Sequence, residues 1–305
     1  MAVAPSRLYR FPFTAMGSPC EIQFFAGDER SAQVAADMAI ADARRLEQRY
    51  SRYRDDSLLA GINRVAAAGG GIEVDAETAG LLDYADTCYR ESGGLFDITS
   101  GILRRAWRFK EGKLPQPGEV EALLSRIGWD RVRWQAPRLE FPPGMELDFG
   151  GIVKEYAADR LAALCLNAGI RHGFINLGGD IRVFGPHPDG RPWHIGVQEP
   201  GRRNVAMGTL AIERGGVATS GDYERCITVD GRRYGHVLNP KTGWPVQHLA
   251  SVTVVADLCV VAGSASTIAM LMEAEGPVWL EALGLPHFWQ DQAGNCGGSL
   301  AAARG

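Results

Sequence analysis

The spacing of hydrophobic residues divides the chain into a part dominated by helical patterns and a part dominated by strands. The longest helical pattern runs from Ser31 to Tyr53, where apolar residues recur every three or four positions and the charged residues lie mostly off that face. From Phe174 onward, short apolar segments rich in β-branched residues alternate with glycine-containing turns. No internal repeat, low-complexity linker or clean domain boundary separates the two parts.

Turn and cap signals predict several shorter elements. Asp75 precedes an apolar helical pattern and is a typical N-cap, and a last long helix is expected around Ile268. Asp230-Gly231 lies between two apolar segments and is a typical hairpin turn. The tail, residues 291–305, consists mainly of small and polar residues, and we expect it to be frayed.

The stretch Leu147–Arg160 combines an acid, two glycines, a lysine and the start of a helical pattern. It predicts a strand that ends in a glycine turn, followed by a helix that ends near Gly169. A helix N-terminus carries free N–H groups and partial positive charge, glycines let an anion approach the backbone, and Lys154 adds a full charge. The stretch is therefore a candidate cradle for a phosphate or pyrophosphate. It matches neither the P-loop nor the dinucleotide fingerprint, and an ordinary structural turn is an equal alternative.

Length and composition are those of a globular chain with a large core. With 305 residues, 46% of them hydrophobic and 22% charged, we expect one domain, or two intimately joined halves at about 1–145 and 146–290. The net charge of −4 gives no electrostatic reason to expect nucleic acid or an anionic membrane as a partner. No segment approaches the roughly 18 apolar residues of a membrane helix, and residues 1–13 lack an apolar signal core, so we expect a cytoplasmic location.

The six cysteines and six histidines carry no metal signature. No two cysteines form a CxxC pair, and the histidines include no HExxH motif and no tight pair. A zinc site, a redox dithiol and a histidine-rich metal site are therefore not expected, and most cysteines are expected to be small core residues.

Loops with chemically useful side chains follow one another in a distinctive order. Along the chain they are Gly93–Thr99, Gly150–Lys154, Asn176–Asp180, Ala218–Tyr223 and His236–Gly243. This ordered series, from about Met16 to about Gly276, resembles the ApbE family of FAD:protein FMN transferases.

The resemblance implies an α+β fold with mixed and antiparallel sheets flanked by helices around a flavin cleft. It implies an enzyme that cleaves the pyrophosphate of FAD, attaches FMN to a threonine or serine hydroxyl of an acceptor protein and releases AMP, with Mg²⁺ as the metal. A homodimer is left open. Two alternatives also stay open: a flavin-binding homologue that has lost the transfer and has a redox or scaffold role, and an FAD pyrophosphatase that releases FMN and AMP.

Three residues are candidates for the chemical step. Attack by a hydroxyl needs a base within hydrogen-bond reach, and His236 is the first candidate because the ordinary pKa of histidine lies near neutrality. Asp222 is the second candidate base, and Lys154 would offset negative charge that develops on the pyrophosphate. The alternatives are a His236 that only packs and an Asp222 that only caps a turn.

The remaining expected contacts with FAD fall into two groups. By resemblance, the flavin half of the cleft contains Met16, Gly17, Tyr53, Ser57, Leu58, Phe96, Asp97 and Thr99. The other expected contacts are Gly150, Gly151, Gly178, Gly179, Asp180, Ser220, Gly221 and Thr242. A flavin needs an apolar slot with a few fixed polar groups, although Phe96 and Tyr53 could equally be ordinary core aromatics.

Two departures from the family pattern concern the metal. The family's Ala-Asp-Ala-x-Ala-Thr motif corresponds to Ala262–Thr267, so Thr267 is retained but Gly263 replaces the aspartate. The glycine that follows the lysine in the family is Glu155 here. The resemblance implies that the Val153 carbonyl and the Thr267 side chain bind the metal, and we hypothesise that Glu155 replaces the missing carboxylate. The alternatives are a Glu155 that points into solvent or pairs with the neighbouring lysine.

Overall fold

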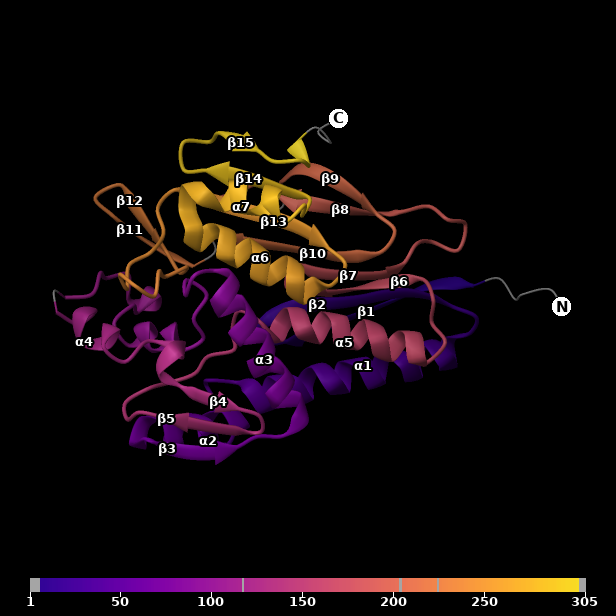
Figure 1. Ribbon diagram of the computed structural model, residues 1–305. Helices are drawn as coiled ribbons and strands as arrows, with labels where there is room; N and C mark the ends of the chain where they lie inside the picture. The colour runs from indigo at the N-terminus through magenta and orange to yellow at the C-terminus, as the bar shows by residue number, and fades with distance from the viewer. Residues whose placement is uncertain (1–5, 117, 203–204, 224, 302–305) are drawn as a thin grey trace.

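The computed structural model describes residues 6–116, 118–202, 205–223 and 225–301, and it is built around an eight-stranded sheet (Figure 1). The strand order is β1-β2-β6-β7-β10-β13-β14-β15, and every neighbouring pair is antiparallel. The strands are β1 Arg7–Ala15, β2 Ser18–Ala26, β6 Gly173–Leu177, β7 Asp180–Gly185, β10 Gly215–Gly221, β13 Leu249–Ala256, β14 His287–Asp291 and β15 Cys296–Gly297. Because β2 pairs with β6, the sheet crosses the position near residue 145 where the sequence suggests a division into halves.

Long helices cover one face of this sheet (Figure 1). They are α1 Glu29–Tyr50, α5 Val153–Asn167 and α6 Cys259–Met272, with the shorter α7 Gly276–Ala282 beside α6. α5 packs against both α1 and α6, which explains why its small apolar residues occur on more than one side. The largest core cluster lies between these helices and the sheet.

The opposite face of the sheet is covered by the hairpin of β8 Trp193–Gln198 and β9 Ala206–Ile212. Side chains alternate between the faces along a strand, so Ile175 and Phe184 join the helix-covered core while Phe174 and Val183 join the second core. Both faces of the central strands are therefore buried, as their nearly continuous apolar sequences require.

Smaller elements surround one end of the sheet. Helices α2 Leu58–Ala68 and α3 Ala76–Glu91 accompany a three-stranded sheet of β3 Gly70–Glu73, β5 Arg138–Phe141 and β4 Arg133–Gln135. A third core cluster joins the 3₁₀ helix Ser100–Arg105, α4 Glu121–Leu124 and the hairpin of β11 Cys226–Val229 and β12 Arg232–Gly235. The other 3₁₀ turns are Phe109–Glu111, Trp129–Arg131 and Glu273–Glu275.

Several local predictions are confirmed. The Asp75 side chain accepts a hydrogen bond from the backbone N–H of Thr78 and caps α3. Asp230 and Gly231 both have positive φ angles, 50° and 75°, as a two-residue hairpin turn between β11 and β12 requires.

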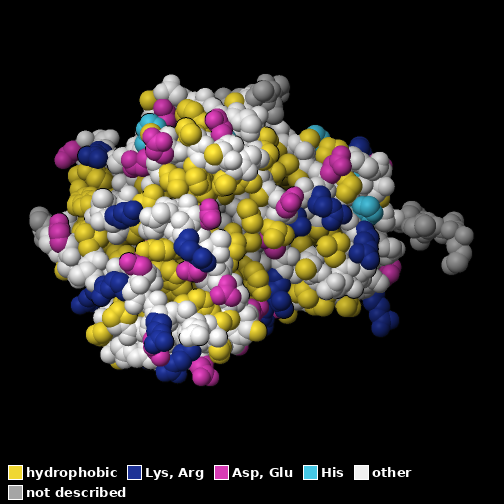
Figure 2. Space-filling model, viewed as in Figure 1, with side chains coloured by type: hydrophobic (Ala, Val, Ile, Leu, Met, Phe, Trp, Pro, Cys, Tyr) yellow, Lys and Arg dark blue, Asp and Glu magenta, His cyan; other side chains and the backbone are white. Residues whose placement is uncertain are grey.

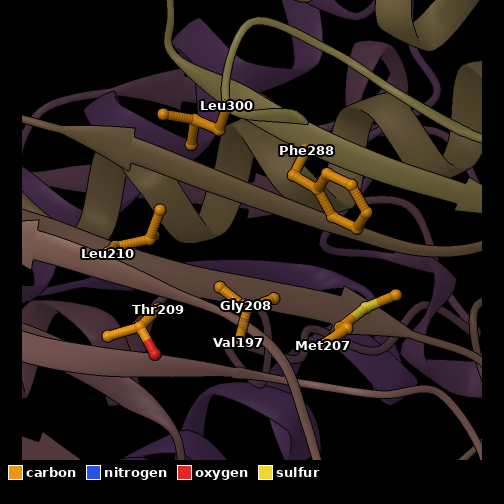
Figure 3. A pocket seen from close by; sticks show the side chains of 7 residues that line it. All are labelled: Val197, Met207, Gly208, Thr209, Leu210, Phe288 and Leu300. Atoms are coloured by element: carbon orange, nitrogen blue, oxygen red, sulfur yellow. The ribbon is translucent and has the colours of Figure 1, made fainter. Parts of the chain in front are cut away.

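The prediction of a frayed tail is wrong for residues 291–301. Residues 296–297 add strand β15 to the edge of the sheet, and Leu300 packs against the second core. Leu300 also borders a small apolar pocket with Val197, Leu210 and Phe288 (Figure 3). Strand pairing and apolar contact outweigh the polar composition of this segment, and residues 302–305 lie outside the described part of the chain.

The surface carries mixed charge. On the face shown in Figure 2, basic and acidic side chains are interspersed. Within the described residues, the search for a helix with the length and hydropathy needed to span a membrane finds none.

Candidate active site

The site is centred on the N-terminal end of α5, where the Gly150-Gly151 turn leads into the helix. Asn63 holds the segment that leads into this turn, because its side chain donates to the Leu147 carbonyl (2.9 Å) and accepts from the Leu147 N–H (2.7 Å). Asp148 accepts a hydrogen bond from the Gly150 N–H (2.9 Å) and pairs with the Arg52 guanidinium. The predicted strand at Leu147 and Asp148 is wrong. The Asn63 side chain takes up the backbone groups of Leu147, and the Asp148 N–H donates to the Ile98 carbonyl, which lies outside any strand (2.8 Å).

An aromatic ring closes over the glycine turn. A Cβ atom at Gly151 would lie 3.3 Å from Cζ of Phe96, so the ring packs directly on the backbone there. Phe96 is itself buried. The loop after it is held by Asp97, whose carboxylate accepts from the Thr99 N–H (2.7 Å), the Thr99 hydroxyl (2.6 Å) and the Trp129 N–H (3.0 Å). Both Asp97 and Thr99 are buried, so the geometry favours a role in shaping the loop over direct contact with a ligand.

Two tight turns meet beside this helix end. Met16 and Gly17 connect β1 to β2, and Gly178 and Gly179 connect β6 to β7, all four with positive φ angles. A Cβ atom at Gly178 would lie 2.7 Å from Cβ of Ser18 and 3.9 Å from Nζ of Lys154. The two turns and the lysine, predicted separately along the chain, therefore lie at one corner of the molecule.

Lys154 and Glu155 differ in their surroundings. The Lys154 ammonium lies 2.7 Å from the carboxylate of Asp180. Glu155 is 8% exposed, and among the described residues only the neighbouring carboxyl of Asp180 is placed to share a hydrogen bond with it. Burial and the negative charge of Asp180 raise the pKa of Glu155. The alternative of a Glu155 that points into solvent is therefore wrong.

Hydroxyl groups from β10 and α6 meet next to these residues. Ser220 lies 2.8 Å from the hydroxyl oxygens of both Ser266 and Thr267. Ser266 in turn donates to the Gly263 carbonyl (2.9 Å). Thr267 follows Gly263 by four residues and so lies on the same side of α6.

His236 directly follows β12 and part of its surface is exposed, yet enough protein surrounds its ring for desolvation to act on it. Desolvation by the surrounding protein and the positive charges of Arg225, Lys154 and Arg52 lower the pKa of His236 to about 4. The imidazole is therefore neutral at pH 7 and can accept a proton. The effect of Lys154 and Arg52 on this pKa places their charges in the neighbourhood of His236.

Asp222, the second candidate base, is held in place by its neighbours. Its carboxylate lies 3.1 Å from the guanidinium nitrogens of Arg233 and accepts from the Gln292 side chain (2.5 Å). A Cβ atom at Gly235 would lie 2.5 Å from Cβ of Asp222, so Asp222 packs against the backbone just before His236. This geometry favours a positioning role over proton transfer.

The remaining residues predicted to contact FAD cap a helix, pack in the core, end a strand or lie exposed at the surface. Ser57 is the N-cap of α2 and is buried, Leu58 packs on the main core, and Tyr53 is 79% exposed beneath the Arg52 guanidinium. Gly221 ends β10, and Thr242 is an exposed residue of the loop after β12. The alternative of Tyr53 as a core aromatic is therefore wrong.

Arg52 and Arg225 are site residues that the sequence reasoning missed. Both are arginines outside helices and strands, in segments without periodicity, so the pattern gave no signal for them. Within the described ranges, no three side chains of His, Cys, Asp or Glu come together as a metal cluster.

The fold and this corner together define an α+β protein with a glycine-lined candidate site at a helix N-terminus, where Lys154 and Arg52 are each paired with an aspartate. The sequence model of the ApbE family matches residues 16–289. An FAD:protein FMN transferase from Chlamydia pneumoniae is 32% identical, over 78% of this chain and 76% of its own length. Its counterpart from Haemophilus influenzae is 29% identical, over 72% of this chain and 67% of its own length.

Solved structures agree with this match. The ApbE protein of Thermotoga maritima has a TM-score of 0.89 and 29% identity, covering 98% of this chain and 100% of its own. The flavinyl transferase ApbE of Pseudomonas stutzeri has a TM-score of 0.85 and 27% identity, covering 97% and 95%. The chain belongs to the ApbE family.

Proposed function

We propose that this protein is an FAD:protein FMN transferase. In the reaction, the hydroxyl oxygen of a threonine or serine in an acceptor protein attacks the phosphorus of the FMN half of FAD. The bond from that phosphorus to the bridging oxygen breaks, AMP leaves with the bridging oxygen, and FMN stays on the acceptor as a phosphodiester. The proton of the attacking hydroxyl passes to a base, for which His236 is our first candidate.

The observation that carries this proposal is the electrostatic interaction of His236 with Lys154, the residue that follows the glycine turn at the start of α5. The hydroxyl and the pyrophosphate must be held in one place, because positioning and charge supply most of the catalysis in phosphoryl transfer. Desolvation and then the charges of Arg225, Lys154 and Arg52 act on His236, and two of these cations are themselves held by aspartates, Lys154 by Asp180 and Arg52 by Asp148. The same charges would attract the two phosphates of FAD.

The low pKa of His236 fits this role. A neutral imidazole is ready to accept a proton at pH 7, and the approach of the negative pyrophosphate would raise the pKa of His236 toward neutrality. Asp222 would keep the loop of His236 in place through its contact with Gly235.

The residues present fit a divalent cation. The buried carboxyl oxygens of Glu155 and the neighbouring hydroxyl oxygens are the hard donors that Mg²⁺ prefers. Glu155, Thr267 and the carbonyl of Val153 are the residues that would hold it. When bound, the cation would offset negative charge on the pyrophosphate.

The direct test is to incubate the purified protein with FAD and Mg²⁺ and to measure AMP, together with FAD affinity by flavin fluorescence. We expect preferential binding of FAD over free FMN, because flavin and phosphate contacts occur together. Absence of FAD binding would overturn the proposal. AMP with stoichiometric free FMN would favour the pyrophosphatase, and FAD binding without AMP, even with an acceptor, would favour the flavin-binding homologue. The cytoplasmic location and a homodimer remain predictions.

A further inference from the structure

The side chain of Glu155 fills the space that a side chain at position 263 would need. A Cβ atom built on Gly263 would lie 2.5 Å from Cγ of Glu155, 3.0 Å from its Cδ and 3.0 Å from its Oε1. Real Cβ atoms do not approach other carbons this closely. Glu155 on α5 and any side chain at 263 on α6 are therefore alternatives for the same space.

The pairing of α5 with α6 fixes this arrangement. Asp159, one turn after Glu155, accepts hydrogen bonds from the backbone N–H groups of Cys259 and Val260, both at 2.9 Å. These are the first two residues of α6, one turn before Gly263. Asp159 also pairs with Arg182 of β7 at 3.0 Å. The capped helix start therefore holds Glu155 and Gly263 opposite each other.

The space around Glu155 has the chemistry of a site for a hard cation. Glu155 is 8% exposed, and apart from the carboxyl of Asp180 no group of the described residues offers its Oε2 a hydrogen bond. Two buried acids side by side are costly unless a proton or a cation joins them. The nearby carboxylate of Asp180 adds negative charge, which the ammonium of Lys154 offsets. The Thr267 hydroxyl is one helical turn from Gly263.

We propose that Glu155 supplies from α5 the carboxylate of a divalent-cation site that it shares with Thr267, in place of a carboxylate carried by position 263. The inference rests on the proposed function for the use of the cation, but the site itself can be tested without FAD. The space between α5 and α6 has room for one of the two carboxylates and not for both. Moving the acid from position 155 to position 263 should therefore preserve cation binding.

The experiment uses Mn²⁺, whose free concentration is measured by electron paramagnetic resonance during titration of the full chain without FAD. We expect the wild type to bind one Mn²⁺ per chain. Glu155→Gln and Glu155→Gly should each weaken binding at least about tenfold, because the charged ligand is lost. Glu155→Gly combined with Gly263→Asp should restore affinity to near the wild-type value. Glu281→Gln, an exposed glutamate of α7, is the matched control and should bind as the wild type does.

Circular dichroism of each variant would show that it is folded, and the near-isosteric Glu155→Gln guards against misfolding of the glycine variants. Unchanged Mn²⁺ affinity in Glu155→Gln, or absence of Mn²⁺ binding by the wild type, would overturn the inference. Its failure is separable from that of the proposed function. AMP production with unaffected Mn²⁺ binding in Glu155→Gln would leave the transferase standing without this site. Mn²⁺ binding that depends on Glu155, in a protein that produces no AMP, would support the cation site and contradict the transferase.

Discussion

At the scale of single residues, the most consequential feature is a histidine whose surroundings lower its pKa. Desolvation, and after it the positive charges of Arg225, Lys154 and Arg52, lower the pKa of His236 from its ordinary 6.5 to about 4. A lowered pKa means that the neutral form persists down to acidic pH, so the proposed base is unprotonated under physiological conditions. An ordinary surface histidine would be partly protonated just below neutrality.

This predicts the outcome of an NMR titration of the six histidine rings, with His236 assigned from the spectrum of His236→Gln. The midpoint of the His236 signal should lie well below pH 6, and removal of one neighbouring cation by Arg225→Gln should move it upward. A midpoint at 6.5 or above would contradict the assignment of positive charge around His236.

Also at this scale, the sequence predicted residue types better than residue roles. Lys154 and His236 each stand in a loop motif whose order along the chain is distinctive, and Lys154 lies near enough to lower the pKa of His236. Asp97, Thr99 and Ser57 instead direct their polar atoms to neighbouring backbone groups, which no spacing pattern could reveal. Arg52 was not predicted, because its position depends on a partner, Asp148, that lies 96 residues away in the chain.

At the scale of elements, the contact between α5 and α6 places Glu155 against Gly263. Glycine inside a helix normally costs about 1 kcal/mol relative to alanine, so its presence here needs a packing reason. The reason is the side chain of Glu155, which leaves no room for a Cβ.

The effect of Gly263→Ala on the free energy of unfolding should therefore depend on which residue stands at position 155. In the wild type it should destabilise the protein by about 1–3 kcal/mol, because the new methyl group overpacks the contact. In the Glu155→Ala background, where Cγ is gone, it should be neutral or stabilising by up to about 1 kcal/mol. Urea unfolding in the presence of a chelator measures both free energies.

Gly80→Ala is the matched control, since a Cβ at this helical glycine of α3 would meet open space. It should stabilise the protein equally in both backgrounds. If Gly263→Ala has the same effect with and without the Glu155 side chain, the two residues do not compete for space.

Element boundaries show where sequence patterns fail. The helix after the glycine turn and its end at Gly169 were predicted, because capping and glycine signals are local. The strand predicted at Leu147 is absent from the structure, because the Asn63 side chain takes up the backbone N–H and carbonyl of Leu147. Nothing in the local pattern of an apolar residue beside an acid indicates this contact.

At the scale of the whole molecule, the sheet is buried on both faces and its last edge is made by the tail. β15 pairs with β14, and Leu300 packs on the second core with Phe288 (Figure 3). The order of the strands could not be predicted from periodicity, because β2 with β6 and β7 with β10 are pairings between distant segments. The resemblance to a family predicted the α+β class instead.

Truncation after Ala293 should lower the melting temperature by several degrees. It removes β15 and Leu300, which uncovers the edge of β14 and part of the second core. Gln292, which contacts Asp222, is retained, so that the loop of His236 keeps its support. Leu300→Ala alone should give a smaller decrease, and differential scanning calorimetry compares the three proteins. An unchanged melting temperature after truncation would mean that the tail does not contribute to the core.

The measurement that tests the central claim most directly is covalent flavin transfer. The protein, FAD and Mg²⁺ are incubated with a cell protein extract, and flavin fluorescence is recorded on a denaturing gel while AMP is quantified. We predict fluorescent acceptor bands, with a threonine or serine carrying FMN by mass spectrometry, and AMP in equal amount. His236→Ala should lose both products while its FAD affinity stays within a few-fold of wild type, because a base acts on the chemical step. AMP without covalent flavin, or transfer that survives in His236→Ala, would contradict this account.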